Sequence, residues 1–336
     1  MAARLKIATF NLESLDDRTH PGRDFPDRVA ILRPQLNRLR ADILCLQEVN
    51  AREEHRHGLR SLSALDQLLD GTDYADYARF ASVNRLGKRF SDRHNLVILS
   101  RWPIVRTRQI WHDLVAAPSY HPTTAGPDLT IEWDRPVLHI EVDLGLARPL
   151  HIVNVHLRAP RAAFLPGHKD HGVWTSVGGW AEGFFLANLK RSGQALEVRL
   201  LVDTIFDADA QALIAVCGDF NASDDETPVR IVRGDEEDTA NGHLAMRTLV
   251  SAERSMPATQ RFSVIHHGRP VMLDHILLSR PLLGWYVGSE VHNETLGDEL
   301  VAPALVRTPP GSYHAPLIAT LQPPARPRRP ASRLSP

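Results

Sequence analysis

The chain has 336 residues, 43% of them apolar, and a formal net charge of −1 at pH 7. This length allows a large hydrophobic core, arranged as one large domain or as two ordinary ones. The balanced charge excludes a global electrostatic attraction to nucleic acid or to an anionic membrane, so any site for a polyanion must be local.

The first third of the chain alternates predicted strands and helices. A strand over Lys6–Asn11 precedes a helix over Asp27–Arg40, in which leucine recurs at helical spacing. A strand over Asp42–Glu48 and a shorter helix over Leu59–Leu69 follow. The chain enters its first strand without an apolar signal segment, and no run approaches the roughly 20 residues needed to cross a bilayer. We therefore expect a cytoplasmic protein.

Further strands are predicted over Tyr77–Val83, Asn95–Ser100, Val137–Val142 and His151–Val155. A basic cluster overlaps the first two of them, with Asp92 as the single acidic residue. We interpret this cluster either as a solvated surface or as a track for phosphate groups. Its members are Arg79, Arg85, Lys88, Arg89, Arg93, Arg101, Arg106 and Arg108.

Residues 158–188 form a long segment that is rich in Pro, Gly and Trp. A loop of this length inside a compact domain is either functional or disordered, and the aromatic content argues against disorder. We interpret the segment as a lid or a substrate-selecting insertion. The alternative is a surface loop whose tryptophans only anchor it to the body of the domain. His168 and His171 are weak evidence for a second metal site, because no Cys pair lies near them.

The last part of the chain begins with a predicted amphipathic helix over Leu189–Phe206 and a strand over Ala212–Cys217. Cys217 and Cys45 each lie in an apolar run and are expected to be reduced core thiols. We expect residues 1–322 to form one domain and the Pro- and Arg-rich residues 323–336 to form a disordered tail. The acidic run at residues 235–238 would repel nucleic acid if it lay near the site.

A recurrent design links the strands: an apolar run ends in a polar group able to bind a divalent cation or to orient a phosphate. The clearest case is Gly218-Asp219-Phe220-Asn221. Because strand side chains alternate faces, we expect Asp219 and Asn221 to point the same way and Phe220 to point into the core. Taken alone, this pattern is also that of an ordinary turn. The design recurs at residues 6–11, 42–48, 151–156, 272–278 and 312–317.

With these segments in this order, the chain resembles the endonuclease/exonuclease/phosphatase superfamily, the DNase I-like metal-dependent phosphoesterases. Mixed strands and helices without strict βαβ repetition favour an α+β domain. The resemblance implies a four-layer αββα sandwich, with two packed mixed sheets flanked by helices. The matching motifs are Thr9-Phe10-Asn11, Leu46-Gln47-Glu48-Val49, Asn95-Leu96-Val97-Ile98-Leu99-Ser100-Arg101, Asn154-Val155-His156-Leu157, Gly218-Asp219-Phe220-Asn221, Leu273-Asp274-His275-Ile276-Leu277 and His314-Ala315-Pro316-Leu317.

The resemblance and the residue types together imply roles for the metal and the base. Glu48 is a hard oxygen ligand of the type that Mg²⁺ or Mn²⁺ prefers, and the resemblance places Asn11 beside it. His314 is the expected general base, and the resemblance places Asp274 against its second nitrogen.

The remaining predicted site residues would contact substrate or water. Asp219 and Asn221 are expected to position the attacking water and a non-bridging oxygen, and His156 to contact the phosphate or support the leaving oxygen. Asn95 and Arg158, which flanks the insertion, are the expected substrate-binding residues.

One position departs from the family pattern. Members commonly carry Asp immediately before the catalytic His, where it contributes to metal binding, and this chain has Tyr313. A phenol with a pKa of about 10 is a poor ligand for Mg²⁺. His275 does not replace the missing carboxylate, because strand alternation turns it away from Asp274. The departure has three alternative consequences: lower metal affinity, a mechanism that does not use two metal ions, or a weakened enzyme.

Three functions remain open on this basis. The leading one is Mg²⁺- or Mn²⁺-dependent hydrolysis of phosphodiester bonds in nucleic acid by His-assisted attack of water. The second is hydrolysis of small-molecule or phospholipid phosphoesters, because fold resemblance does not fix the substrate. The third is a catalytically weakened binding protein, suggested by Tyr313. The sequence identifies no protein partner.

Overall fold

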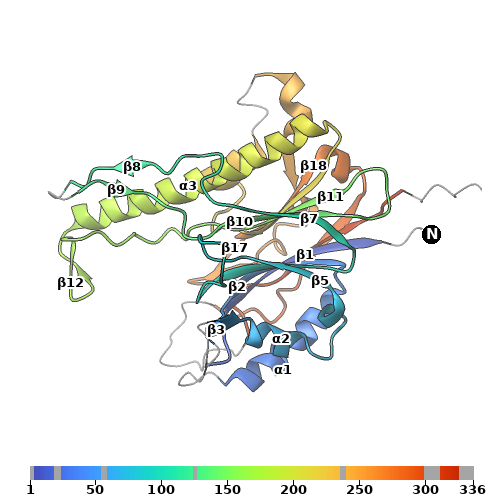
Figure 1. Ribbon diagram of the computed structural model, residues 1–336, viewed down its shortest axis with the longest axis horizontal. Helices are drawn as coiled ribbons and strands as arrows, with labels where there is room; N and C mark the ends of the chain where they lie inside the picture. Colours follow the sequence, from blue (N-terminus) through green and yellow to red (C-terminus); the bar gives the residue numbers. More distant parts are fainter. Residues whose placement is uncertain are drawn as a thin grey trace, which may run out of the picture.

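The computed structural model describes residues 4–18, 24–53, 59–123, 127–234, 240–298 and 311–324. Two six-stranded sheets pack face to face, and helices cover their outer faces (Figure 1). The expected α+β, four-layer αββα sandwich is confirmed.

The first sheet has the strand order β19-β20-β1-β2-β6-β5. Its β1 and β2 run parallel, whereas β1 and β20 run antiparallel, so the sheet is mixed. The strands are β1 (Leu5–Leu15), β2 (Ile43–Val49), β5 (Ala78–Ala81), β6 (Asn95–Ser100), β19 (Tyr286–Val291) and β20 (Leu317–Leu321).

The second sheet has the order β15-β18-β14-β11-β10-β7 and is also mixed, because only β11 and β14 run parallel. Its strands are β7 (Ile104–Ile110), β10 (Val137–Val142), β11 (Leu150–His156), β14 (Leu213–Asp219), β15 (Leu249–Ser251) and β18 (Asp274–Ser279). Short two-stranded pairs are β3 (Arg52–Glu53) with β4 (Arg60–Ser61), β8 (Ser119–Tyr120) with β9 (Leu129–Thr130), β12 (Lys169–Asp170) with β13 (Val173–Trp174), and β16 (Val264–His266) with β17 (Arg269–Val271).

Strand alternation divides the apolar side chains into three buried layers. One layer lies between the sheets and includes Ile7 and Cys217, and both cysteines are free and buried as expected. A second layer packs the first sheet against α1 and α2, and a third packs the second sheet against α3 and α4. The helices are α1 (Phe25–Leu39), α2 (Ser63–Leu69), α3 (Val177–Ala208), α4 (Thr227–Arg233) and α6 (Arg280–Leu283), with 3₁₀ turns at Asp73–Asp76, Gly242–Arg247 and Ala252–Ser255.

A buried polar network ties the two sheets together beneath their shared end. The Gln47 amide donates to Asn154 Oδ1 at 2.8 Å, and the Asn154 amide donates to the carbonyl oxygens of Leu46 and Val97. Gln47 and Asn154 are fully buried. Because a buried amide must be satisfied, this network fixes the relative placement of β2 and β11.

The largest difference from expectation is α3, which begins at Val177 instead of Leu189. The second half of the predicted 158–188 insertion is therefore helical and not a loop. This part of α3, with residues 119–123, 127–130 and 160–176, forms an arm that projects beyond the sandwich (Figure 1). The arm has its own small core, made of Ile131, Ala163, Leu165 and Leu186.

Other expectations differ less or lie outside the described residues. The helix predicted over Leu59–Leu69 begins at Ser63, after the short strand β4. The acidic run at 235–238 and most of the predicted tail, residues 325–336, lie outside the described residues. Within the described part of the chain, no helix is both long and apolar enough to cross a bilayer.

Candidate active site

The register of the second sheet brings three predicted site residues into one row. His156 on β11 pairs with Asp219 on β14, and Asp219 pairs with Asp274 on β18. Asp219 and Asp274 share the parity of strand residues that pack between the sheets, so they point toward the first sheet. His275 points to the opposite face, as expected, beside the layer under α3.

The first sheet supplies the facing side chains. Asn11 lies on β1, with the parity of the inter-sheet residue Ile7. Its amide nitrogen donates to Asp219 Oδ2 at 2.9 Å and lies 3.4 Å from Glu48 Oε1. Asn11 therefore bridges two carboxylates that are 171 positions apart in sequence and belong to different sheets.

Glu48 reaches this group through an irregular backbone. Regular alternation would turn it to the same side as Leu46, which packs under the helices. The register of β2 instead shifts between Leu46 and Val49, and Glu48 has φ +59°. A non-glycine residue in this region stores backbone strain, which is typical of functional sites. Ser14 holds the carboxylate, donating from its N–H (2.9 Å) and its hydroxyl (3.1 Å) to Oε2.

His314 is placed between two carboxylates. Its Nδ1 lies 2.8 Å from Asp274 Oδ2, and its Nε2 lies 4.0 Å from Asp219 Oδ2. The first distance is a hydrogen bond, and the second leaves a gap too long for a direct one. Ser263 supports the arrangement: its Oγ accepts from the N–H of Asp274, and its carbonyl accepts from the N–H of Ala315, the residue after His314.

Asp219 and Asn221 do lie together, but strand alternation is not the reason. β14 ends at Asp219, and Asn221 has φ +49°. The Asn221 N–H donates to Asp219 Oδ1 at 2.8 Å, which closes an Asx turn. Phe220 is fully buried in the layer under α3, as expected. Gly218 precedes the turn with φ +144°, and a Cβ there would lie 2.0 Å from the Val155 carbonyl oxygen.

Two basic residues that the sequence analysis missed complete the group. Arg135 Nη2 lies 2.9 Å from His94 Nδ1, and His94 Nε2 lies 3.7 Å from Glu48 Oε2. His156 Nε2 lies 3.4 Å from Asp219 Oδ2 and 3.7 Å from Glu48 Oε1. Weak signals existed in the sequence, because Arg135 lies two residues before a predicted strand and His94 directly precedes the Asn95 motif.

Burial and mutual charge set the protonation of the group. Burial raises the pKa of Asp219 to about 7, and the neighbouring Asp274 acts in the same direction although His314 opposes it. Burial acts to lower the pKa of His314, but the carboxylates of Asp274 and Asp219 outweigh it and raise that pKa to about 10. Burial also acts to raise the pKa of Glu48, yet His94, Arg135 and His314 hold it below its ordinary value.

The donor set suits a hard divalent cation. Glu48 and Asp219 supply carboxylate oxygens to one small region, and Asp219, Asp274 and His314 have ligand atoms within 4.8 Å of one another. Asp274 Oδ1 is buried and has no hydrogen-bond partner among the described residues. A raised carboxyl pKa and an unpartnered carboxylate oxygen both indicate a deficit of positive charge, and oxygen donors are those that Mg²⁺ and Mn²⁺ prefer.

Two predicted substrate-binding residues behave differently from this group. Asn95 is buried, and among the described residues its amide bonds to backbone groups of Val49 and Ser91, so it braces the chain after Glu48. The structure does not bring Asn95 into the group, because its polar atoms already have backbone partners. Arg158 follows β11 and donates to Asp134 at 2.9 Å, next to Arg135.

The backbone around Tyr313 is anchored to β1. The Tyr313 N–H donates to Glu13 Oε2 at 2.8 Å, and the Ser312 hydroxyl donates to the Asn11 carbonyl at 2.8 Å. Residue 313 therefore sits beside Asn11 even though it carries a phenol instead of a carboxylate.

The basic cluster from Arg79 to Arg108 is not a continuous track. Arg79 lies on β5 of the first sheet, whereas Arg106 and Arg108 lie on β7 of the second. Six of the eight basic residues form described ion pairs with carboxylates. The pairs are Arg79 with Asp66, Arg85 with Glu132, Arg93 with Asp92, Arg101 with Asp42, Arg106 with Glu141 and Arg108 with Asp113. The interpretation as a solvated surface therefore fits better than a phosphate track.

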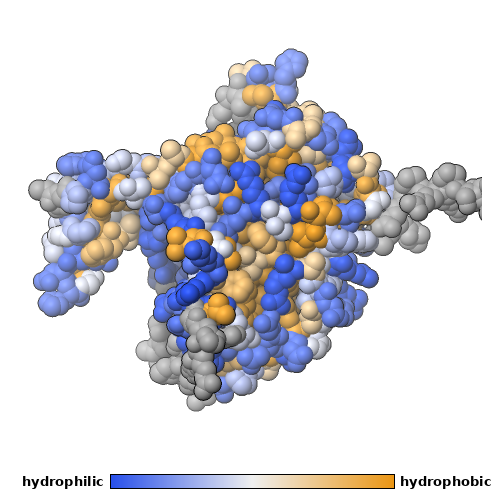
Figure 2. Space-filling view, in the orientation of Figure 1, coloured by the Kyte–Doolittle hydropathy of each residue, from blue (hydrophilic) through white to orange (hydrophobic). Residues whose placement is uncertain are grey.

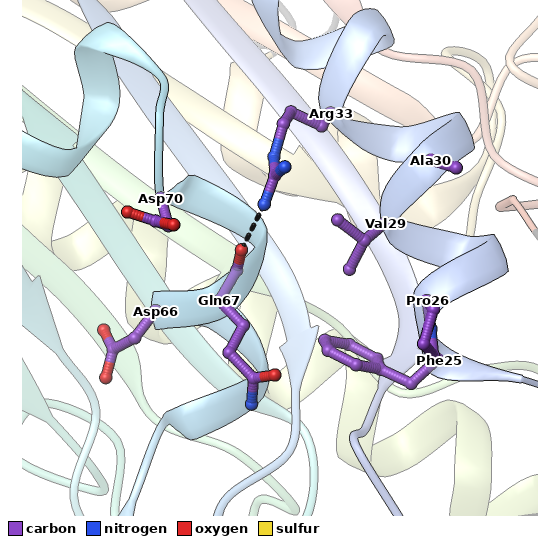
Figure 3. Close-up of a pocket in the computed structure, with 8 residues that line it drawn as sticks. All are labelled: Phe25, Pro26, Val29, Ala30, Arg33, Asp66, Gln67 and Asp70. Carbon is purple, nitrogen blue, oxygen red and sulfur yellow. Dashed lines mark hydrogen bonds between the residues drawn. The ribbon is translucent and has the colours of Figure 1, made fainter.

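A groove between α1 and α2 lies apart from this group (Figure 3). Phe25 and Val29 form its apolar wall, and Arg33 closes one end by donating to the Gln67 carbonyl at 2.6 Å. None of the predicted site residues lines this groove, so its shape carries no information on the chemistry.

Comparison with known proteins agrees with the fold. The model of the Endonuclease/Exonuclease/phosphatase family matches residues 8–314. No curated protein matches the chain. Three solved structures are similar: truncated TDP2 from Caenorhabditis elegans (15% identity, TM-score 0.57, covering 95% of this chain and 98% of that one), an endonuclease/exonuclease/phosphatase from Bacteroides vulgatus (16%, 0.57, 95% and 99%), and the 3′ phosphatase NExo from Neisseria bound to a product DNA hairpin (16%, 0.53, 95% and 99%). At these identities the likeness is one of fold.

Proposed function

The chain belongs to the Endonuclease/Exonuclease/phosphatase family, and we propose that it is a divalent-metal-dependent phosphodiesterase that hydrolyses nucleic acid. The observation that carries the proposal is His314, hydrogen-bonded to Asp274 on one nitrogen and facing Asp219 across 4.0 Å on the other. Members of this family are metal-dependent phosphoester hydrolases, and two similar structures are an exonuclease and a DNA-bound 3′ phosphatase from Neisseria.

In this proposal the two sides of His314 have different tasks. Asp274 fixes the ring and its Nδ1–H, so that Nε2 faces the gap toward Asp219. A water in this gap would donate its proton to Nε2 while Asp219 and Asn221 hold its orientation. The base must lose its own proton first, and the metal-free site opposes this because the surrounding carboxylates stabilise the imidazolium.

Glu48, assisted by Asn11 and Asp219, would hold Mg²⁺ or Mn²⁺. When bound, the cation supplies positive charge that stabilises the phosphate oxygens and, by repulsion, lowers the pKa of His314. His156 is buried, and burial together with Arg135 holds its pKa well below the ordinary value, so it is neutral and can donate to a phosphate or leaving oxygen. Arg135 and Arg158 provide the local positive charge that the chain lacks overall.

Metal binding can be tested separately from turnover. Mn²⁺ titrated into the native protein, followed by calorimetry or by the loss of free Mn²⁺ signal in electron paramagnetic resonance, should saturate near one ion. Glu48→Gln should weaken binding at least tenfold, whereas Asp66→Asn, at an exposed carboxylate on α2, should not. Equal Mn²⁺ affinity in native protein and Glu48→Gln would refute this metal site.

Hydrolysis of small-molecule or phospholipid phosphoesters is the second candidate. It is favoured by the ion-paired state of the basic cluster, which removes one argument for a polyanion track. Salt dependence separates the two candidates, because phosphate contacts along a nucleic acid release counterions. A steep fall in substrate affinity with salt supports nucleic acid, and a flat response supports the small substrate.

A weakened enzyme or binding protein is the third candidate, and Tyr313 is the reason to consider it. Tyr313→Asp restores the carboxylate at a backbone position that lies beside Asn11. If the native protein turns over and the variant gains neither Mn²⁺ affinity nor rate, this candidate is removed. A native protein inert toward every phosphoester but rescued by Tyr313→Asp would support it.

A further inference from the structure

The arm carries apolar side chains that the fold does not cover. Phe164, Val173, Val177, Trp180 and Phe185 are all exposed, and Trp180 retains 44% of its surface. Figure 2 shows apolar surface on the projecting arm between hydrophilic stretches. Trp180 and Phe184 stack on each other one helical turn apart, with ring centroids 5.4 Å apart and planes 18° from parallel. Trp180 is exposed and Phe184 is half-buried, so the pair presents part of its ring surface to the solvent.

The arm is built firmly enough to hold these rings in place. Buried Glu182 accepts hydrogen bonds from the Tyr120 hydroxyl and from Thr123, and lies 3.0 Å from His168 Nε2. The Ser176 hydroxyl caps α3 by accepting from the Gly179 N–H. Gly183 allows close packing, because a Cβ there would lie 2.4 Å from the Ala163 carbonyl. These contacts join the loops of the arm to α3.

The stacked rings lie on the helix face that leads to the site. Trp180, Phe184 and Arg191 are at positions i, i+4 and i+11 of α3, within roughly 40° of one another around the helix. Arg191 is buried, and its Nη1 donates to the Asn221 carbonyl at 2.8 Å. At about 1.5 Å per residue, Phe184 and Trp180 lie about 10 and 16 Å along the axis from Arg191.

The direction of the strands places this arm on the catalytic side of the molecule. In Figure 1 the N-terminus enters β1 on the right, and β3, which directly follows β2, lies on the left. The arm projects to the left, and β1 and β2 therefore end on its side with Asn11 and Glu48.

The arm and its base carry a small excess of positive charge. Residues 158–191 contain five basic residues, Arg158, Arg161, Lys169, Lys190 and Arg191, and two acidic ones, Asp170 and Glu182. Glu182 is buried and already bonded, so Asp170 is the exposed carboxylate of this segment. Of the basic residues there, Arg158 and Lys190 are ion-paired with Asp134 and Arg191 with Glu226, and the arm also carries the exposed Asp128.

We propose that Trp180 and Phe184 form a stacking platform for the bases of a single-stranded nucleic acid segment whose scissile phosphate lies at the His314 group. This inference rests on the proposed nuclease function. Aromatic rings bind bases by stacking without reading sequence, and they need an unpaired base face that a duplex keeps covered. The rings lie about 10 to 16 Å along α3 from Arg191, which is the length of about three to five nucleotides stacked at about 3.4 Å each.

The test measures binding without cleavage. A fluorescent single-stranded oligonucleotide, the same sequence as a blunt duplex, and a strand of equal length with abasic residues are titrated into His314→Ala protein without metal. Adding Trp180→Ala should weaken single-strand binding about tenfold, which corresponds to loss of one stacked base. The duplex and the abasic strand should change less than twofold, and Trp180→Phe should keep most of the affinity.

Val173→Ala, on the same arm, serves as the matched control and should bind the single strand like its parent. Equal weakening of all three ligands by Trp180→Ala, or no weakening, would overturn the platform. The platform would also be overturned if Trp180→Ala left oligonucleotide affinity unchanged but altered the oligomeric state or the binding to phosphatidylcholine vesicles. Either result would show that the rings contact a second copy of the chain or a lipid surface. If the native protein hydrolyses bis(p-nitrophenyl) phosphate but oligonucleotide binding does not depend on Trp180, the result refutes the stacking platform and leaves the proposed phosphodiesterase function intact. If the protein is inert toward every phosphoester but binds single strands through Trp180, the result refutes the nuclease proposal and leaves the stacking platform intact.

Discussion

The Nδ1 atom of His314 lies 2.8 Å from Oδ2 of Asp274, although the two residues are 40 positions apart. Asp274 begins β18 of the second sheet, and His314 lies three residues before β20 of the first. Ser263 joins the two positions, because it bonds to the backbone on both sides of this pair. The Asp274 carboxylate therefore occupies Nδ1 and leaves Nε2 of the imidazole available for chemistry.

Asp274→Asn should reduce turnover while leaving the fold intact. An amide can donate to Nδ1 as well as accept from it, so the ring loses its fixed tautomer and its charged partner. We expect kcat for bis(p-nitrophenyl) phosphate to fall roughly 10²- to 10⁴-fold. Asp66→Asn, which alters an exposed carboxylate on α2, is the control and should keep the native rate. An Asp274→Asn enzyme of native kcat would remove the orienting role.

Asp219→Asn should stabilise the metal-free protein above neutral pH. The folded pKa of Asp219 is raised from 3.8 to about 7, so its stabilising contribution is complete below pH 3.8 and is lost as pH rises to 7. The variant lacks this titration. In EDTA, Tm of the native protein should fall relative to Tm of Asp219→Asn between pH 4 and 8. If Tm of the two proteins changed with pH in parallel, the result would contradict a raised pKa of Asp219 in the folded protein.

Removing one partner of the buried pair of His275 and Glu253 behind the site should be strongly destabilising. His275 Nδ1 lies 2.5 Å from Glu253 Oε1 and its Nε2 lies 2.8 Å from the Ala222 carbonyl, which follows the Asn221 turn. Burial acts to lower the pKa of His275, but Glu253 and the hydrogen bonds outweigh it and raise it. The stabilisation is therefore complete below pH 6.5 and declines as pH rises through the folded pKa.

His275→Gln should cost about 3–5 kcal/mol in the free energy of unfolding at pH 6, since it leaves Glu253 buried without a cation. The cost should shrink at higher pH, and Glu253→Gln in the same chain should recover part of it. Urea unfolding at pH 6 and pH 9 measures both effects. A cost that is small, or that grows with pH, would show that His275 is not a buried cation.

Gly218→Ala should be severely destabilising. The backbone has φ +144°, and the added Cβ would lie 2.0 Å from the Val155 carbonyl oxygen in the parallel β11–β14 pair. We expect a loss of more than about 3 kcal/mol, from strain and overpacking together. Gly288→Ala on β19 is the control, because nothing lies within 4 Å of its new Cβ. Similar thermal unfolding of the two variants would contradict this reading of Gly218.

Much of the fold could be predicted from the sequence, because the apolar strands and their polar ends carry strong local signals. The strands over Asn95–Ser100 and Val137–Val142 appear with the predicted bounds. The start of α3 could not be predicted, because Gly178, Gly179 and Gly183 disfavour helix locally. Close packing of the arm against Gly183 overrides that preference, and such packing is visible only in three dimensions.

The same limit applies to the site. Its carboxylates and histidines were identified as residue types at strand ends, but the geometry that joins them depends on φ +59° at Glu48 and φ +49° at Asn221. Regular strand alternation would turn Glu48 away from the site. For Asn221, alternation predicts the correct side, but the residue reaches it through an Asx turn after the strand has ended. Arg135 and His94 enter the site through contacts across the two sheets, for which the linear sequence carries only a weak signal.

The most direct test of the account is hydrolysis of bis(p-nitrophenyl) phosphate and of plasmid DNA by native protein and His314→Ala, with Mn²⁺, Mg²⁺ or EDTA. We predict turnover by the native protein that requires the metal, and at least a roughly 100-fold lower rate in His314→Ala with the metal present. Native-like turnover in His314→Ala, or native turnover that persists in EDTA, would contradict the proposed metal-dependent phosphodiesterase.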